Sequence, residues 1–316
     1  MSKRLLSISL FIALFCIAVY SQDEPATKPA ASLPKPDIAD SKYGPFTANT
    51  FDLWKAESKK PTPLVIFIHG GGLASGDKSK LSPNQLSVML RAGLSVMAIN
   101  YRLTGEAVFP QHYMDCARAI QFARYHAKEF NIDPKVVALT GSSAGGMTSL
   151  WIGFHDDFAD PKNTDPVLRE STRVKVIAVF SAQTTLVPEV VTKYIGVLAT
   201  QYNSYSNGKM FGLTAAEMNT PKAADLYKAI SPLTYLTKDD PPVWAMYSIP
   251  NKPLTAASTT SEAIHHPGFG VVLKEEMDKL KIECKLRHKD DGQNVNGDMS
   301  SFLLKYLKID ASNSTK

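Results

Sequence analysis

Cysteine is scarce in this sequence, and its three cysteines are widely separated. Cys16 lies in an apolar N-terminal run, which leaves Cys116 and Cys284 in the rest of the chain. Two cysteines cannot build a disulfide-rich scaffold, and no CxxC or HExxH pattern is present. Because Cys116 falls in a predicted helix and Cys284 in a predicted core strand, we expect two buried thiols. No metal site and no cofactor are predicted.

Blocks of one charge are also absent. The chain has 35 Lys and Arg and 30 Asp and Glu, a formal net charge of +5, and its basic residues are scattered. This distribution is typical of a solvated surface, so no nucleic-acid partner is predicted. With 44% hydrophobic residues, the 316-residue chain can bury a large core as one α/β domain. Nothing in the sequence indicates an oligomeric state.

The one long apolar run stands at the N-terminus. The segment LLSISLFIALFCIAVY follows a basic start, which predicts a signal peptide over residues 1–21. An uncleaved anchor and a lipoprotein attached at Cys16 are alternatives, although Phe15 is a poor residue before a lipidated cysteine. No later stretch approaches roughly 18 consecutive apolar residues. We therefore expect a secreted or periplasmic protein that makes no membrane contact after cleavage.

Local patterns then divide the chain. Residues 22–42 combine Pro, Ala and charge, which predicts a Pro-rich linker before a domain over residues 43–310. Strand-like segments such as LVIFIH, LSVMAINY and VVALTG alternate with helical patterns such as residues 112–129. This alternation predicts an α/β fold with a mainly parallel central sheet and helices on both faces. Residues 183–237 lack strand-like runs and are expected to form a small helical cap.

The most specific motif is G-x-S-x-G over residues 141–145, between an apolar strand and a helix. A serine at the tip of such a strand-turn-helix is presented to a cleft, and the flanking glycines relieve crowding in the tight turn. Ser142 lacks glycines at these offsets. Ser143 is therefore predicted to be a nucleophile, and the alternative is a surface serine in a glycine-rich turn.

A second glycine motif ends the first long apolar strand at residues 69–72, His-Gly-Gly-Gly. Consecutive glycines let backbone N–H groups approach a developing oxyanion without an intervening Cβ. We predict that the N–H groups of Gly70, Gly71 and Ala144 form an oxyanion hole. A phosphate-binding loop is the alternative, but no Lys-Ser/Thr pair follows at the required spacing.

These motifs carry a family resemblance. Residues 43–182 contain, in order, FIHGGG, NYRL and NIDPKVVALTGSSAGG, and they resemble the esterase/lipase branch of the α/β-hydrolase superfamily. Within that branch they are similar to hormone-sensitive-lipase-like and feruloyl-esterase-like carboxylesterases. The resemblance implies an α/β-hydrolase fold, a serine esterase, and structural roles beside the oxyanion loop for Tyr101, Arg102 and Asp115. After residue 182 the resemblance fades.

The rest of a catalytic triad is not evident. The family pattern places an acid after the strand that follows the cap and a histidine after the last strand. Here Asn251 stands near the first position, and the loop KDDGQNVNGD holds no histidine. Four of the seven histidines are excluded as the base by their positions in the predicted elements. The remaining candidates for the base, of which at most one can serve, are His265, His266 and His288.

Two arrangements are open. In one, His265 or His266 is the base and Asp290 or Asp291 on the final loop orients it. In the other, His288 at the end of the last strand is the base. A structural role for all three histidines is the alternative to both.

The predicted function is hydrolysis of a short acyl or carbohydrate-linked ester through an acyl-enzyme on Ser143, with a small-molecule or carbohydrate ester as substrate. A catalytically impaired binding protein that keeps the hydrolase fold is the alternative from another class. A peptidase is a third option, although no separate recognition domain is predicted.

Overall fold

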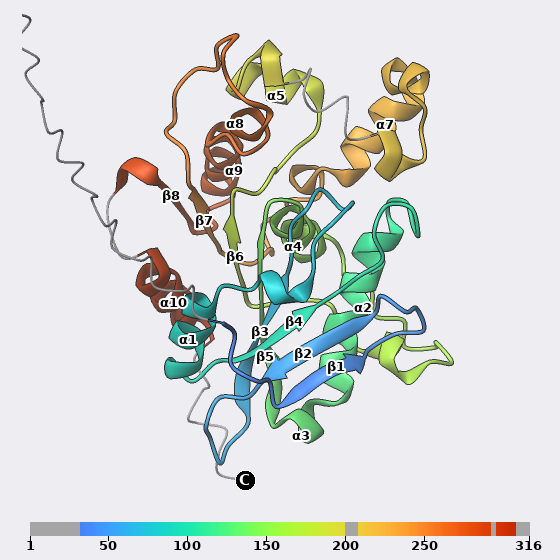
Figure 1. Ribbon diagram of the computed structural model, residues 1–316, viewed down its shortest axis with the longest axis vertical. Coiled ribbons are helices and arrows are strands. Elements are labelled where there is room, and N and C mark those ends of the chain that lie inside the picture. The colour runs from blue at the N-terminus through green and yellow to red at the C-terminus, as the bar shows by residue number, and fades with distance from the viewer. Residues whose placement is uncertain (1–31, 200–207, 292–294, 308–316) are drawn as a thin grey trace, which may run out of the picture. The chain divides into compact units, whose positions relative to one another are not determined.

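The computed structural model describes residues 32–199, 208–291 and 295–307, so the predicted signal peptide lies outside the described residues. Within them, one eight-stranded sheet runs in the order β1-β2-β4-β3-β5-β6-β7-β8 (Figure 1). The strands are β1 (Ile38–Lys42), β2 (Thr50–Trp54), β3 (Thr62–Ile68), β4 (Ser95–Ile99), β5 (Ile132–Ser142), β6 (Val176–Phe180), β7 (Val243–Tyr247) and β8 (Cys284–His288).

The sheet is mainly parallel, as the sequence predicted. Only β2 pairs antiparallel with its neighbours β1 and β4, and the pairs from β4 through β3 and β5 to β8 are parallel. Every residue of β3 and β4 is buried, which is typical of parallel strands covered on both faces. The carboxyl ends of β3, β5 and β7 therefore lie at the same edge of the sheet.

Helices cover both faces of this sheet. The α-helices are α1 (Pro83–Arg91), α2 (Gln111–Tyr125), α3 (Ala127–Phe130), α4 (Ala144–Phe154), α5 (Pro188–Tyr194), α7 (Pro221–Ile230), α8 (Thr260–Ile264), α9 (Gly268–Lys279) and α10 (Val295–Tyr306). Short 3-10 turns are η1 (Lys78–Lys80), η2 (Pro166–Arg169), η3 (Ala215–Asn219), η4 (Pro232–Thr234) and η5 (Lys289–Asp291). Side chains alternate along β5, so Leu139 joins the core with α2, α4 and α9, whereas Ala138 joins the core with α1 and α10.

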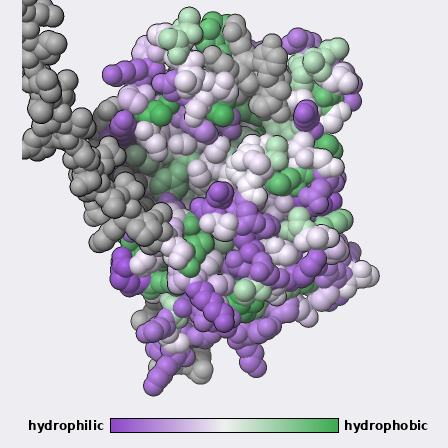
Figure 2. Space-filling model, viewed as in Figure 1, coloured by the Kyte–Doolittle hydropathy of each residue, from purple (hydrophilic) through white to green (hydrophobic). Residues whose placement is uncertain are grey.

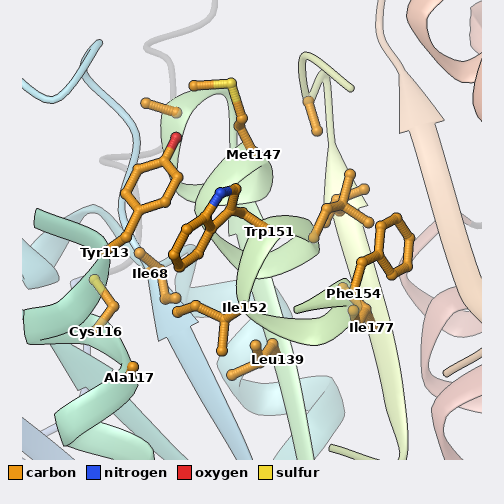
Figure 3. Packing of buried hydrophobic residues seen from close by; sticks show 14 of the residues in the cluster. Ile68, Tyr113, Cys116, Ala117, Leu139, Met147, Trp151, Ile152, Phe154 and Ile177 are labelled. Atoms are coloured by element: carbon orange, nitrogen blue, oxygen red, sulfur yellow. The ribbon is translucent and has the colours of Figure 1, made fainter. Parts of the chain in front are cut away.

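Helix α4 lies at the centre of the larger core. All of its residues are buried. Trp151 points toward Tyr113 of α2 (Figure 3), with ring centroids 5.0 Å apart, and its Nε1 donates to the carbonyl of Ala229 at 2.8 Å. Cys116 also lies in this core, and Cys116 and Cys284 are both buried free thiols, as predicted. This packing fixes the helix that begins directly after Ser143.

The folded region begins before Tyr43, contrary to the predicted boundary. Strand β1 lies inside the segment 22–42 and pairs with β2. Its Asp40 also forms an ion pair with the buried Lys78, whose Nζ lies 2.8 Å from Asp52. Polar composition misled the prediction because an edge strand buries few side chains. Figure 2 shows mainly hydrophilic residues over the lower part of this face, where β1 lies in Figure 1.

The predicted cap falls between β6 and β7. Its described residues contain α5, η3, α7 and η4 and no strand, and residues 200–207 are outside the description. Among the described residues, no helix combines the length and hydropathy that crossing a membrane requires.

Candidate active site

Ser143 occupies a strained turn between β5 and α4. Its backbone has φ 53° and ψ −123°, a combination that costs a non-glycine residue about 1–3 kcal/mol. A Cβ added to Gly145 would lie 2.1 Å from the carbonyl oxygen of Ile68, and one added to Gly141 would lie 2.6 Å from the backbone of Gly145. Both glycines are therefore needed for close backbone contact, and the turn between them projects the serine from the sheet edge.

His265 is the candidate histidine that reaches this serine. Its Nε2 lies 2.9 Å from Ser143 Oγ. It caps the C-terminal end of α8, in the segment that follows β7. In the tautomer that lets the serine hydroxyl donate to Nε2, the neutral ring carries its proton on Nδ1, and this atom lies 3.2 Å from the hydroxyl of Ser261.

His266 makes different contacts and is not placed as a base. Its Nδ1 accepts a hydrogen bond from the backbone N–H of Gly268 at 3.0 Å, and its Nε2 donates to the carbonyl of Lys252 at 2.8 Å. Both nitrogens of this buried ring are thus bound to backbone groups. His266 stabilises the connection from α8 to α9.

His288 and Asp291 are paired with each other at the end of β8. The carboxylate of Asp291 accepts from the backbone N–H of His288 at 2.8 Å, and its second oxygen lies 3.6 Å from Nδ1 of that ring. The hypothesis that Asp291 orients His265 is therefore corrected, because the described partner of His265 Nδ1 is Ser261. Asp290 lies in η5, and its side chain is outside the description.

The carbonyl groups at the start of the glycine loop accept hydrogen bonds from side chains of the protein. The carbonyl of His69 accepts from the hydroxyl of Tyr101 at 2.8 Å, and the carbonyl of Gly70 accepts from His69 Nδ1 at 2.8 Å. A trans peptide directs its N–H opposite to its C=O. The N–H groups of Gly70 and Gly71 consequently point away from these partners.

The peptide after Gly71 also has its carbonyl bound within the protein, and the glycine loop lies against the turn that holds Ser143. The carbonyl of Gly71 accepts from the backbone N–H groups of Ala74 and Ser75 at 3.0 and 3.1 Å. A Cβ on Gly70 would lie 2.6 Å from the carbonyl oxygen of Ser142. Ala144, as the first residue of α4, has an N–H with no acceptor inside its helix.

The residues expected to support this loop do so. The guanidinium of Arg102 binds Asp115 through Nε at 2.8 Å and Nη2 at 2.7 Å, and the side chain of Tyr101 stacks on the buried ring of His69 with centroids 4.4 Å apart. Paired hydrogen bonds to a carboxylate fix both direction and distance. These contacts hold the end of β3 and the start of the loop in one position.

A cavity of about 950 Å³ lies where these groups meet. Its wall includes Ser143, His265 and the three glycines of residues 70–72. Apolar side chains form much of the remaining wall, and Lys80 brings a positive charge to it. The apolar residues in the wall include Met147, Leu186, Met210 and Ile264. The cavity can thus hold an organic group beside the serine.

A comparison with family models decides the family. The model described as BD-FAE matches residues 51–249, more than half of the chain. The chain belongs to the BD-FAE family. The match includes the glycine loop and Ser143 but ends before α8, so it does not extend to His265 or Ser261.

Relatives of this BD-FAE chain are named as ester hydrolases. Mycobacterium tuberculosis LipM, named a probable carboxylic ester hydrolase, is 27% identical over 218 residues, covering 67% of this chain and 46% of LipM. Esterase LipQ from the same organism is 24% identical and covers 76% of this chain and 55% of LipQ. The chain therefore spans about half the length of these relatives.

Solved structures show that this BD-FAE chain has the α/β-hydrolase fold. A truncated carbohydrate esterase from gut microbiota superposes with a TM-score of 0.67 at 18% identity, covering 88% of this chain and 99% of that one. Thermogutta terrifontis esterase 2 phosphonylated by cyclosarin gives 0.60 at 19% identity, covering 87% and 94%. The predicted fold and the resemblance to carboxylesterases are confirmed.

Sequence reasoning missed Ser261. The pattern Thr259-x-x-Glu262 is a capping box that starts α8, and it places Ser261 four residues before His265. Residues four apart on a helix face the same side. The sequence therefore predicts that Ser261 and His265 lie on one side of a short helix, but it does not show that α8 approaches Ser143.

Proposed function

We propose that this protein is a carboxylic ester hydrolase that acts through an acyl-enzyme on Ser143. The observation that carries the proposal is the 2.9 Å contact between Ser143 Oγ and His265 Nε2. A nucleophile and a base within hydrogen-bond reach are the minimum for activating a serine hydroxyl. The esterase names of the family relatives support the same reaction class.

In the acylation step, His265 Nε2 takes the proton of Ser143 as Oγ attacks the ester carbonyl carbon. The carbonyl oxygen becomes an oxyanion, which the N–H groups of Gly70, Gly71 and Ala144 stabilise. The bond from carbon to the alcohol oxygen then breaks. The proton on His265 passes to that oxygen, so the alcohol leaves neutral and the acyl group remains on the serine.

Deacylation repeats this sequence with water. His265 takes a proton from the water as its oxygen attacks the acyl carbon, and the same N–H groups receive the second oxyanion. The bond to Ser143 Oγ breaks, and the proton returns to the serine. The free acid is released and the enzyme is restored.

The proposed substrate is an ester of a short acyl group, either simple or carbohydrate-linked. The partly apolar wall of the cavity beside Ser143 supports a small organic group, and one similar fold belongs to a carbohydrate esterase. We also propose that the protein is exported after removal of residues 1–21. The basic start and apolar run of those residues support this.

The second candidate is a binding protein that has the fold without turnover. One observation favours it, because His265 Nδ1 faces a neutral hydroxyl where serine hydrolases place a carboxylate. Both candidates place a ligand in the same cavity. They differ in whether Ser143 is chemically activated.

Labelling with a serine-reactive fluorophosphonate separates these two functions. We expect intact-mass spectra of the purified protein to show one adduct per chain and spectra of Ser143→Ala to show none. Ser142→Ala is the matched control, since the adjacent hydroxyl also lines the cavity, and it should be labelled like the native protein. Absence of an adduct on the native protein would sink the hydrolase proposal and favour ligand binding alone.

Activity is expected to persist below the pH at which an unperturbed histidine becomes protonated. Burial lowers the pKa of His265 from its ordinary value of 6.5, and the backbone hydrogen bond with Ser261 opposes this only in part. The base works when neutral, so kcat/KM should stay level as pH falls through 6.5 and decline at lower pH. A profile of kcat/KM for a p-nitrophenyl ester, corrected for spontaneous hydrolysis, measures this. A midpoint above 6.5 would contradict it.

A further inference from the structure

We propose that Ser261 is the third member of the hydrolytic site, a positioning residue whose hydroxyl accepts the Nδ1–H of His265. This inference rests on the proposed function, because it assigns the partner of Nδ1 on the histidine that is proposed as the base. The two atoms are 3.2 Å apart, and the opposite ring nitrogen lies 2.9 Å from Ser143 Oγ. The three side chains therefore form one continuous chain of hydrogen bonds.

The fold of α8 determines this geometry. Thr259 and Glu262 form a capping box at its start, with the carboxylate accepting from the backbone N–H of Thr259 at 2.7 Å. The backbone N–H of His265 donates to the carbonyl of Ser261 at 3.1 Å. The same residue thus holds both the main chain and the ring of His265, at the helical spacing of four residues.

Three carboxylates that the structure describes near this histidine in the sequence or along the sheet edge have other partners. Glu262 is occupied by the cap, and those hydrogen bonds from Thr259 lower its pKa. Asp291 accepts from the backbone of His288, and Asp298 accepts from Trp244 Nε1 at 2.9 Å. In the described part of the chain, Ser261 is the residue that remains for Nδ1: its hydroxyl lies 3.2 Å from this atom, and its backbone also forms a hydrogen bond that raises the pKa of the ring.

A hydroxyl at this position has a definite chemical consequence. When the hydroxyl accepts the Nδ1–H, Nε2 is free to accept from Ser143, but the hydroxyl adds no negative charge. The imidazolium formed during catalysis is stabilised less than it would be beside a carboxylate. Lys80 on η1, the other charged side chain in the described cavity wall, supplies no negative charge either.

Substitutions at position 261 test this role. Ser261→Ala should lower kcat/KM about tenfold with little change in KM, the loss expected for one neutral hydrogen bond. Ser261→Thr keeps a hydroxyl and should retain activity near that of the native protein. Ser261→Asp should raise the midpoint of the acidic limb of the pH profile by about one unit, because a negative charge then faces Nδ1.

The aspartate variant is expected to fold, because position 261 is in the first turn of α8, where a negative charge is favourable. Thr260→Ala is the matched control, an exposed change on the same helix that should alter neither rate nor pH profile. If Ser261→Ala and Ser261→Asp both keep the native rate and midpoint, the positioning role is overturned. If Ser143→Ala keeps full turnover, the proposed function has failed instead.

Discussion

Replacing Ser143 with alanine is expected to reduce ester turnover at least about a thousandfold, because no covalent intermediate can form. Binding should change far less. The hydroxyl contributes to the cavity wall, but the cavity is formed mainly by the glycine loop and apolar side chains. Alanine also fits the turn sterically, so the loss should not arise from unfolding. Rates on p-nitrophenyl acetate and on an acetylated sugar, together with thermal melting, measure the effect.

Ser142→Ala is the control for this result. Ser142 directly precedes Ser143 in the turn and lines the same cavity, so the substitution removes a neighbouring hydroxyl while leaving the 2.9 Å contact of Ser143 in place. Its turnover should be close to native. Equal losses in the two variants would mean that general disturbance of the turn, and not removal of a nucleophile, explains the effect.

Replacing His265 with alanine is expected to cost a similar factor, because a serine hydroxyl without a base is a poor nucleophile at neutral pH. Residues that act as one unit are not additive. The double variant Ser143→Ala with His265→Ala should therefore be no slower than either single variant. Added imidazole should restore part of the turnover of His265→Ala, since truncation leaves space beside Ser143.

His288→Ala is the matched control among the histidines that the sequence offered. His288 lies at the end of β8 and pairs with Asp291, so its loss should leave kcat/KM within about threefold of native, a change near 0.6 kcal/mol. A large loss in His288→Ala together with a native rate in His265→Ala would reverse the assignment of the base.

The nucleophile and the glycine loop of the site could be predicted from residues that are close together in the chain. The glycines around Ser143 and the run at residues 70–72 have a meaning set by local sterics, because a tight turn and a close backbone approach exclude Cβ atoms. Strand burial over β3 and β5 followed from their apolar runs. The fold and the nucleophile could therefore be predicted without knowing which distant segments meet.

The edge strand and the base required the tertiary structure. Strand β1 is polar, and it is a strand only because β2 offers it hydrogen-bonding partners. Three histidines were equally plausible as bases, since sequence spacing says nothing about a distance across 122 residues. Parallel packing of β5, β6 and β7 brings α8 to the serine, and the cap of that short helix turns Ser261 toward Nδ1. Local sterics determined the nucleophile, and only long-range packing decided its partners.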